Sequence, residues 1–556
     1  MMHPPTMTHG RHTLIILATV GLLMGVVYAF LPLTGPDRYL SPDETANAFF
    51  ASRFAEQRAL TSELPVPSTA GVVAIPRNAL AVDGRMAPLG FVGHTLLVGG
   101  LTWAVGDWSL RLWTAVLTVL AVIASWPFFC SVFGRRTGTL TVLALFISPP
   151  LWYWASHEMV ANVLFVDAII AAFGVGASAV RRRSAWRASA AGLLLGIAVS
   201  LRMNEAVWIA LLGIGVCWPL RRMIGRRAFL WAAGGAVLGV LPTVVANAVI
   251  YGSPFSVGYD AADATGVFST FRTSTFAGQG GLRVMRTLFF PFGIDAREAW
   301  ANAVAYLWTL LPWVSLLTIW GVLRTALQMR VQRVHRRYVA TLALLTAYLC
   351  VYYGSGAFFG SARYGAQPIL GASFLRYWLV LYVFLTPFLV LGIQALLQAV
   401  RRSFLQRLIT ASTVVVVVVL AAHTVFADPS YGLIQSRENL RVHEQTLEDA
   451  ARLIPPNAVI ITATRDKEFF PTYAVIGFGE RSGNRTRIED ALPQLVREVP
   501  LFLIEYPGER ADIRLSAEAR GLHIHHVGAL RDGTVVSQLL AVSSGGDDGG
   551  IVGQTP

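Results

Sequence analysis

Apolar stretches of roughly twenty residues, separated by short runs of arginine, dominate the hydrophobic pattern of this chain. Runs of arginine mark cytoplasmic loops, and they lie at 135–136, 181–187, 221–227, 330–337 and 401–407. The spans consistent with those loops lie near 14–33, 110–133, 138–155, 159–180, 187–201, 205–220, 228–250, 303–325, 339–358, 375–399 and 408–426. The pattern predicts a polytopic α-helical membrane protein of about 11 transmembrane helices, with the amino terminus in the cytoplasm and the carboxyl-terminal part outside.

The apolar segment 89–105 departs from this pattern. It is short, contains Gly99 and Gly100, and carries His94 in its interior. If the segment crossed the membrane, the arginines at 135–136 would fall outside and every later run would be inverted. We therefore expect an interfacial or re-entrant helix within a first outer loop that covers residues 33–108.

Helical and extended patterns alternate beyond the last span. Helical periodicity is present at 439–453, 488–499 and 511–520, and extended runs at 458–462, 501–504, 522–527 and 535–542. The sequence therefore predicts a transmembrane catalytic domain over 1–426, followed by a small extracytoplasmic α/β domain over 427–542. Residues 543–556 are rich in Gly, Ser and Asp and are expected to form a disordered tail.

Composition agrees with the membrane class and excludes a nucleic-acid partner. Hydrophobic residues make up 54% of the chain and charged residues 14%, with a mean hydropathy of +0.55. The net charge of +13 comes from arginines between apolar stretches, which carry topology information and form no binding groove.

Two adjacent carboxylates, Asp43 and Glu44, follow the first span closely. Charge near the hydrocarbon boundary is costly and usually has a purpose. The sequence Ser41-Pro42-Asp43-Glu44 also has the capping serine, early proline and early acids of a helix amino terminus. Capping and catalysis are compatible, since a capped helix would hold a catalytic base rigidly.

His157 and Glu158 lie at the predicted outer junction of two consecutive spans. A polar pair in a tight turn is an ordinary structural feature. A carboxylate beside an imidazole also suits a divalent ion such as Mg²⁺ or Mn²⁺, although two ligands do not make a site. Metal binding and acceptor binding both stay open for this pair.

Several arginines are predicted on the outer side, against the positive-inside trend. Arg202 ends the pattern Gly192-x-x-x-Gly196-x-x-x-Ser200, whose small residues four apart indicate one face of a tightly packed helix. Arg363 and Arg376 follow later, each before a tyrosine, and Arg272, Arg283 and Arg286 are weaker examples. A guanidinium binds phosphate through two hydrogen bonds, so these residues are candidates for a lipid phosphate, with interfacial anchoring as the alternative for each.

An ordered series of segments resembles a known family. The series comprises Asp43-Glu44 at the start of the outer loop, Gly84-Arg85-Met86-Ala87-Pro88, Gly106-Asp107, Phe133-Gly134-Arg135, Ser148-Pro149 leading into His157-Glu158, the helix 192–202, and Tyr251-Gly252-Ser253-Pro254-Phe255. Together these resemble the GT-C superfamily of polyprenyl-phosphate-sugar-dependent glycosyltransferases. The most similar branch is that of the bacterial relatives of protein O-mannosyltransferases and aminoarabinose lipid A transferases.

The resemblance implies a function and a set of roles. Asp43, with Glu44 beside it, matches the first-loop acid that acts as general base on the acceptor hydroxyl, and Glu158 matches the second-loop acid. Arg202, Arg363 and Arg376 are candidates for the basic residues that bind the lipid phosphate. The expected enzyme is a hexosyl- or pentosyltransferase of the bacterial cytoplasmic membrane. Its partners would be a polyprenyl-phosphate-linked sugar, membrane lipids and a glycan, lipid or protein acceptor.

Two rival functions come from other classes. A transporter or flippase of cell-envelope intermediates would need a polar site at the bilayer midplane on broken helices. A membrane-anchored receptor would use the carboxyl-terminal part alone, for which eleven predicted spans are excessive. Acidic residues at one predicted surface favour sugar transfer, with a single displacement that inverts the anomeric centre.

Overall fold

The computed structural model describes residues 7–66, 74–210, 212–213, 225–259, 289–328, 333–365, 367–398, 403–477, 485–506 and 512–541. The chain divides into two compact units. The first contains Met1–Thr34, Arg111–Pro242 and Gly278–Ser436, and the second contains Gly35–Leu110, Thr243–Ala277 and Arg437–Pro556. The second unit therefore combines the first predicted outer loop with the carboxyl-terminal part, although these segments are far apart in the sequence.

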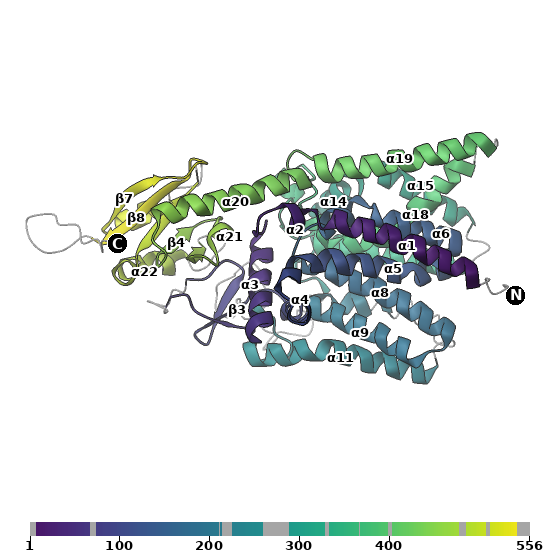
Figure 1. Ribbon diagram of the computed structural model, residues 1–556, viewed down its shortest axis with the longest axis horizontal. Helices are drawn as coiled ribbons and strands as arrows, with labels where there is room; N and C mark the ends of the chain where they lie inside the picture. The colour runs from purple at the N-terminus through teal and green to yellow at the C-terminus, as the bar shows by residue number, and fades with distance from the viewer. Residues whose placement is uncertain are drawn as a thin grey trace, which may run out of the picture. The chain divides into compact units, whose positions relative to one another are not determined.

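The first unit is built from helices, several of which are long and run side by side (Figure 1). They are α1 (Met7–Tyr28), α2 (Phe30–Thr34), α5 (Trp113–Phe133), α6 (Arg135–Phe146), α7 (Pro149–Ala155), α8 (Ala161–Arg182), α9 (Ala185–Leu201), α11 (Arg226–Tyr251, which ends in the second unit), α14 (Ala296–Val304), α15 (Pro312–Gln328), α16 (Arg333–Gly354), α17 (Ser373–Tyr377), α18 (Leu379–Gln398) and α19 (Ser403–Ala427). Short turns of helix lie at Asp107–Leu112, Met203–Glu205, Ala305–Thr309 and Ala362–Tyr364.

The apolar helices identify a multi-pass membrane protein. Within the described ranges, six helices are long and apolar enough to cross a bilayer, or up to eight if each bent pair counts as one span. Several of these helices expose apolar side chains, as Leu22 on α1 and Val249 on α11, which is expected of surfaces that face lipid.

Two predicted spans differ from continuous helices. The predicted helix at 138–155 breaks between Phe146 and Pro149, because the Pro149–Pro150 pair lacks the backbone N–H groups that a helix interior needs. The predicted span at 303–325 is bent by 94° between Thr309 and Pro312. The predicted span at 187–201 corresponds to α9, after which the chain turns by 116° around Arg202. Half of the predicted span at 205–220, namely residues 211 and 214–220, lies outside the described residues.

The small-residue face predicted on α9 packs against α11. A Cβ atom on Gly192 would lie 1.9 Å from the carbonyl oxygen of Ala232, and one on Gly196 would lie 2.2 Å from that of Ala236. The Ser200 hydroxyl donates to the carbonyl oxygen of Gly239 at 2.9 Å. The prediction of a tightly packed helix face is therefore confirmed, and glycine allows the two backbones to approach this closely.

The second unit contains two sheets. The smaller one has the order β1-β3-β2 and is antiparallel, with β1 at Ser62–Glu63, β2 at Ala79–Val82 and β3 at Arg85–Pro88. Asp83 and Gly84, both at positive φ, make the tight turn between β2 and β3. Two helices of the same loop, α3 (Pro42–Gln57) and α4 (Val92–Val105), pack against each other.

The larger sheet has the order β5-β4-β6-β8-β7. Its strands are β4 (Val459–Thr462), β5 (Ala474–Gly477), β6 (Leu501–Glu505), β7 (Leu522–Ala529) and β8 (Val535–Ala541), of which β4, β5 and β6 are parallel. The accompanying helices are α20 (Leu433–Leu453), α21 (Asp466–Phe469), α22 (Arg485–Glu498) and α23 (Asp512–Ala519). Figure 1 shows α20 beside this sheet.

One hydrophobic core joins the two parts of the second unit. Phe50 of α3 and Met86 of β3 are each 1% exposed, and they cluster with Ile460 and Phe502 of the larger sheet. The ring of Phe49 also meets that of Phe470 edge-on at 4.9 Å. The early loop that carries Asp43 and the carboxyl-terminal sheet are therefore parts of one packed body.

Candidate active site

The first candidate pair lies in the first turn of α3. The Ser41 hydroxyl accepts a hydrogen bond from the backbone N–H of Glu44 at 3.2 Å. The Glu44 carboxylate in turn accepts from the backbone N–H of Ser41 at 2.8 Å, which completes a reciprocal capping box. Pro42 occupies the first helical position, as its fixed φ favours. The structure therefore gives Glu44, which is 3% exposed, a capping role.

Asp43 differs from its neighbour because its side chain takes no part in the capping box. Asp43 is half-buried, and its Oδ1 accepts a hydrogen bond from the side-chain amide of Asn78. Asn78 directly precedes β2, and its carbonyl oxygen accepts from the backbone N–H of Leu89. A rigid, partly accessible carboxylate held by a neutral donor is the arrangement that a general base requires.

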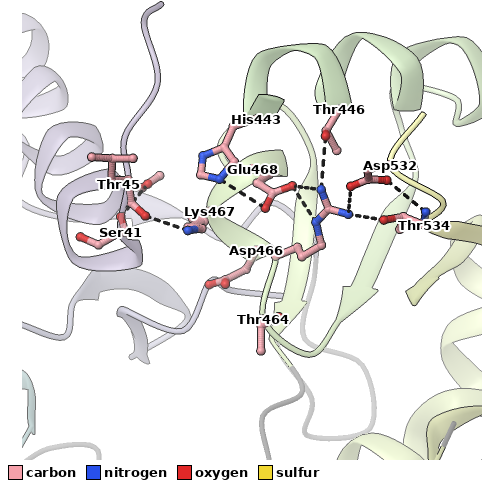
Figure 2. A network of polar contacts seen from close by, with 12 residues as sticks. Ser41, Thr45, His443, Thr446, Thr464, Asp466, Lys467, Glu468, Asp532 and Thr534 are labelled. Carbon is pink, nitrogen blue, oxygen red and sulfur yellow. Dashed lines mark hydrogen bonds and ion pairs between the residues drawn. The ribbon is translucent and has the colours of Figure 1, made fainter. Parts of the chain in front are cut away.

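A buried charged network lies after β4 in the same unit (Figure 2). Arg465, 7% exposed, donates from Nε to Glu468 at 2.7 Å and forms an ion pair with Asp532 at 2.7 Å. His443 of α20 approaches the other oxygen of Glu468 at 3.6 Å. Burial raises the pKa of Glu468, against the opposing effect of Arg465. This network fixes the turn that leads from β4 into α21.

In the first unit, the candidate Glu158 forms an ion pair with an arginine. Arg111 donates from Nε and Nη2 to the two carboxylate oxygens of Glu158, at 2.6 and 2.7 Å. This is a bidentate pair, in which Glu158 is 4% exposed. Nδ1 of the neighbouring His157 lies 2.9 Å from the carbonyl oxygen of Tyr153. Burial lowers the pKa of His157 to about 4, so its ring is neutral at physiological pH.

The donor atoms of this pair do not fit a metal site. Both oxygens of Glu158 are paired with Arg111, and one ring nitrogen of His157 lies against a backbone carbonyl. Within the described ranges there is no group of three or more His, Cys, Asp or Glu side chains that would hold an ion. His157 and Glu158, as arranged, therefore do not supply the Mg²⁺ or Mn²⁺ site considered from the sequence.

Arg202 lies at the sharp bend after α9 and is held by a carboxylate. Its Nε donates to Glu205 at 2.9 Å, and its Nη2 donates to the hydroxyl of Tyr353 at 3.1 Å. Glu205 also accepts from the indole N–H of Trp208. The guanidinium is therefore oriented by neighbours from two separate elements, the helical turn Met203–Glu205 and α16.

Arg202 and Arg376 lie near the same aromatic ring. The guanidinium carbon of each is 5.4 Å from the ring centre of Tyr377. The Tyr377 ring stacks on that of Tyr353, at 4.6 Å between centres and 11° between planes. Cations over aromatic faces are attracted to the ring quadrupole. We refer to Arg202, Tyr353, Arg376 and Tyr377 as the Tyr377 cluster.

The second candidate motif reaches the same cluster. The guanidinium of Arg376 lies 5.8 Å from the ring centre of Trp154, and the Trp154 and His157 rings are 5.1 Å apart. Arg376 also contributes to the lowered pKa of His157, after burial as the main cause. The structure therefore brings His157, Arg202 and Arg376 together, although they are far apart in the sequence.

Arg363 is placed differently. Its side chain is exposed, while its backbone N–H donates to Glu298 at 3.0 Å. The adjacent Ala362 N–H donates to the side chain of Asn302 at 2.8 Å, so α14 anchors this turn. Among the described contacts, none joins the Arg363 side chain to the Tyr377 cluster. Arg272, Arg283 and Arg286 lie outside the described residues.

Sequence patterns did not identify several residues of these sites. Arg111 was assigned to the start of an apolar span, and no pattern linked Asn78 to Asp43. Tyr377 had one usable signal, because it directly follows Arg376 at the outer start of the predicted span 375–399. The contacts of Tyr353 and Tyr377 depend on the packing of α16 against α17, which no local pattern encodes.

Comparison with known proteins shows the fold. The sequence matches no family model and no curated protein. The solved structure of ArnT from Cupriavidus metallidurans bound to undecaprenyl phosphate is similar at 14% identity and a TM-score of 0.51, covering 94% of this chain and 97% of that chain. The apo form of the Archaeoglobus fulgidus oligosaccharyltransferase is similar at 12% identity and a TM-score of 0.51, covering 90% and 71%. Its complex with Zn and sulfate gives 13% identity and a TM-score of 0.53, covering 94% and 72%.

ArnT and the archaeal oligosaccharyltransferase both have the GT-C fold. The structural similarity extends over nearly the whole of this chain. Because the sequence identity is so low, the similarity shows the fold alone. The GT-C-like fold expected from the resemblance is confirmed.

Proposed function

We propose that this protein is a membrane glycosyltransferase that moves a sugar from a polyprenyl-phosphate carrier to an acceptor hydroxyl at the outer face of the cytoplasmic membrane. The observation that carries the proposal is the shared fold, over 94% of this chain, with an ArnT structure that holds undecaprenyl phosphate. ArnT is an aminoarabinose lipid A transferase. The distribution of arginine runs supports the same outer side for the carboxyl-terminal α/β part.

Asp43 is the proposed general base. Its carboxylate stands at the start of a capped helix, outside the capping box that occupies Glu44. The hydrogen bond from Asn78 orients the Asp43 carboxylate, which is the group that would accept the proton of the acceptor hydroxyl. Glu44 stabilises the helix terminus through the capping box, so the two adjacent acids have different proposed roles.

Arg202 and Arg376 are the proposed ligands of the lipid phosphate. The guanidinium carbon of each arginine lies 5.4 Å from the centre of the Tyr377 ring, and Glu205 pairs with Arg202. Two guanidinium groups close to one ring can donate several hydrogen bonds to one phosphate. Arg363, whose side chain is exposed, is the weaker third candidate.

The reaction follows from these roles as a single displacement. The acceptor oxygen attacks the anomeric carbon while its proton passes to Asp43. The bond from that carbon to the phosphate oxygen breaks, and its electron pair stays on the polyprenyl phosphate, where the arginines stabilise the added negative charge. Attack opposite the leaving group inverts the anomeric centre. The bond formed and the bond broken balance without a redox partner.

Transfer from labelled polyprenyl-phosphate sugars by the purified protein in lipid nanodiscs tests this function. We expect Asp43→Asn to insert and fold normally and to reduce transfer by roughly two orders of magnitude. Glu44→Gln should mainly lower the thermal unfolding midpoint, because Gln keeps an acceptor for the capping box but loses the charge. The matched control is Asp83→Asn, an exposed acid of the same loop at positive φ, where Asn is well tolerated. Full transfer by Asp43→Asn would refute its role as base.

A transport function has one specific feature in its favour. Asp167, on the candidate span α8, is 3% exposed and accepts a hydrogen bond from the Thr118 hydroxyl at 2.7 Å. Ionisable residues inside membrane spans often mark transport pathways. A proteoliposome assay of lipid or sugar-lipid movement decides, since transport predicts that Asp167→Asn abolishes movement, whereas sugar transfer predicts no movement in either protein.

A further inference from the structure

We propose that the turn Thr464-Arg465-Asp466-Lys467-Glu468, which joins β4 to α21, is a positioning element for the Asp43 carboxylate. The inference rests on the proposed role of Asp43 and gives the carboxyl-terminal sheet a function in the same reaction. We call this segment the 464–468 turn. All of its partners named below belong to the second unit.

The first connection runs through Asp466 and Arg77. Asp466 is fully buried, and it accepts from the backbone N–H of Arg77 at 2.9 Å and from its Nε at 2.7 Å. Arg77 Nη2 also donates to the carbonyl oxygen of Thr464 at 2.5 Å. The next residue, Asn78, is the donor to Asp43. Asp466 therefore fixes the backbone immediately before the side chain that orients the proposed base.

The second connection runs through Lys467 to the backbone just before the helix that carries Asp43. Its Nζ donates to the carbonyl oxygen of Leu40 at 2.7 Å, directly before the capping residue Ser41. Lys467 also interacts electrostatically with Glu44 in the capping box. Figure 2 shows Lys467 directed toward the helix terminus that carries Ser41 and Thr45. Two consecutive residues of the turn therefore contact both segments that determine the position of Asp43. Lys467 binds the backbone before the helix cap, and Asp466 binds the residue before Asn78.

The turn is itself rigid enough to act as a support. Arg465 is tied to Glu468 and Asp532 by ion pairs at 2.5 and 2.7 Å, and its Nη2 donates to the Thr446 hydroxyl at 3.2 Å. Gly477 at the end of β5 lies against Arg77, because a Cβ there would be 2.8 Å from the Arg77 Cγ. Charged groups that are buried and paired resist rearrangement, since each lost partner leaves a buried charge.

The test compares Asp466→Asn with Asp490→Asn, an identical change at an exposed acid that pairs with Arg520. Hydrogen–deuterium exchange of the full-length protein reports on the support directly. We expect the amides of residues 40–41, 43–47 and 77–80 to exchange about tenfold faster in Asp466→Asn and at an unchanged rate in Asp490→Asn. Arg77→Gln is a second variant, for use if Asp466→Asn does not fold, because the Arg77 side chain is 31% exposed. It should accelerate exchange in the same two segments. Unchanged exchange in these segments overturns the proposal, whatever the transfer assay gives.

A double-mutant cycle separates positioning from general destabilisation. In the wild-type background, Asp466→Asn should reduce the maximal rate of sugar transfer roughly 10- to 100-fold, with donor KM nearly unchanged. In the Asp43→Asn background, Asp466→Asn should reduce the maximal rate less than threefold, because the base that Asp466 positions is already absent. Equal losses in both backgrounds overturn the positioning role. If the wild-type protein transfers no sugar, the proposed function fails, and the exchange experiment still decides whether the turn holds the loop.

Discussion

The side-chain amide of Asn78 donates a hydrogen bond to Oδ1 of Asp43, across 35 residues of sequence. The contact joins the end of an irregular segment before β2 to the first turn of α3. Neither partner has a sequence pattern that points to the other. The two adjacent acids have different surroundings, because Glu44 binds the cap while Asp43 binds a neutral amide.

Removing the amide of Asn78 should weaken catalysis without unfolding the protein. We expect Asn78→Ala to reduce the maximal rate of sugar transfer about tenfold, equivalent to ~1.4 kcal/mol, because Asp43 loses its orienting donor. Transfer kinetics with a labelled donor measure this, with Asp83→Asn as the control. A normal rate in Asn78→Ala would mean that the hydrogen bond has no catalytic role.

Tyr377 should control the affinity for the lipid-linked donor. Its ring contacts both Arg202 and Arg376, and each such contact contributes about 0.5–2 kcal/mol. Tyr377→Leu is therefore expected to raise donor KM by roughly tenfold or more, whereas Tyr377→Phe keeps the ring and should remain close to wild type. Initial-rate measurements over a range of donor concentrations provide the check. Equal KM values in both variants would exclude a role of the ring.

Two adjacent glycines of α11 give a matched test of helix packing. A Cβ atom on Gly235 would lie 2.0 Å from the carbonyl oxygen of Ser189, while one on Gly234 meets nothing within 4 Å. Gly235→Ala should therefore destabilise the protein by about 1–3 kcal/mol, since a backbone must move. Gly234→Ala should stay within about 1 kcal/mol of the wild type. Thermal unfolding of the detergent-solubilised variants measures both, and equal midpoints would contradict the packing of α9 on α11.

Acid should destabilise the second unit through His443. Burial, together with the charges of Lys467 and Arg465, lowers the pKa of His443 to about 3 from its ordinary 6.5. Above pH 6.5 the ring is neutral in both folded and unfolded chains. Below pH 6.5 only the unfolded chain gains the proton, so the free energy of unfolding falls by about 1.4 kcal/mol per pH unit until the folded pKa is reached.

The comparison of wild type with His443→Gln isolates this contribution. Between pH 7.5 and 5.5 the wild-type unfolding midpoint should fall more steeply than that of the variant, because Gln does not titrate. Exchange rates of the α20 amides over the same pH range localise the effect. Parallel pH profiles of the two proteins would show that His443 titrates normally.

Membrane orientation remains a prediction from charge. Reporter fusions after Arg183 and after Pro429 should report opposite compartments, the first cytoplasmic and the second outside. The arginines at 181–183 close α8, which supports an inward end for that helix. Identical signals from both fusions would refute the predicted topology, and with it an outward-facing reaction.

Periodicity alone was sufficient for the elements whose cause is local. The apolar run before Arg181 predicts α8, because some twenty apolar residues have no other way to satisfy their backbone in lipid. Ser41 and Pro42 likewise predict the start of α3, since a cap depends on side chains within one turn. The turn at Asp83-Gly84 carried a hairpin signal of the same local kind, which the sequence interpretation did not use.

Long-range packing decided the remainder. The sequence alone determined a membrane protein with a capped acidic pair after its first span, because hydrophobic length and capping act over a few residues. Only the tertiary structure decided that Glu44 serves the cap and Asp43 meets Asn78, and that Arg202 and Arg376 share the ring of Tyr377. These contacts join residues separated by tens to hundreds of positions, and the side chains that meet are selected by how helices and sheets pack, for which no local pattern exists.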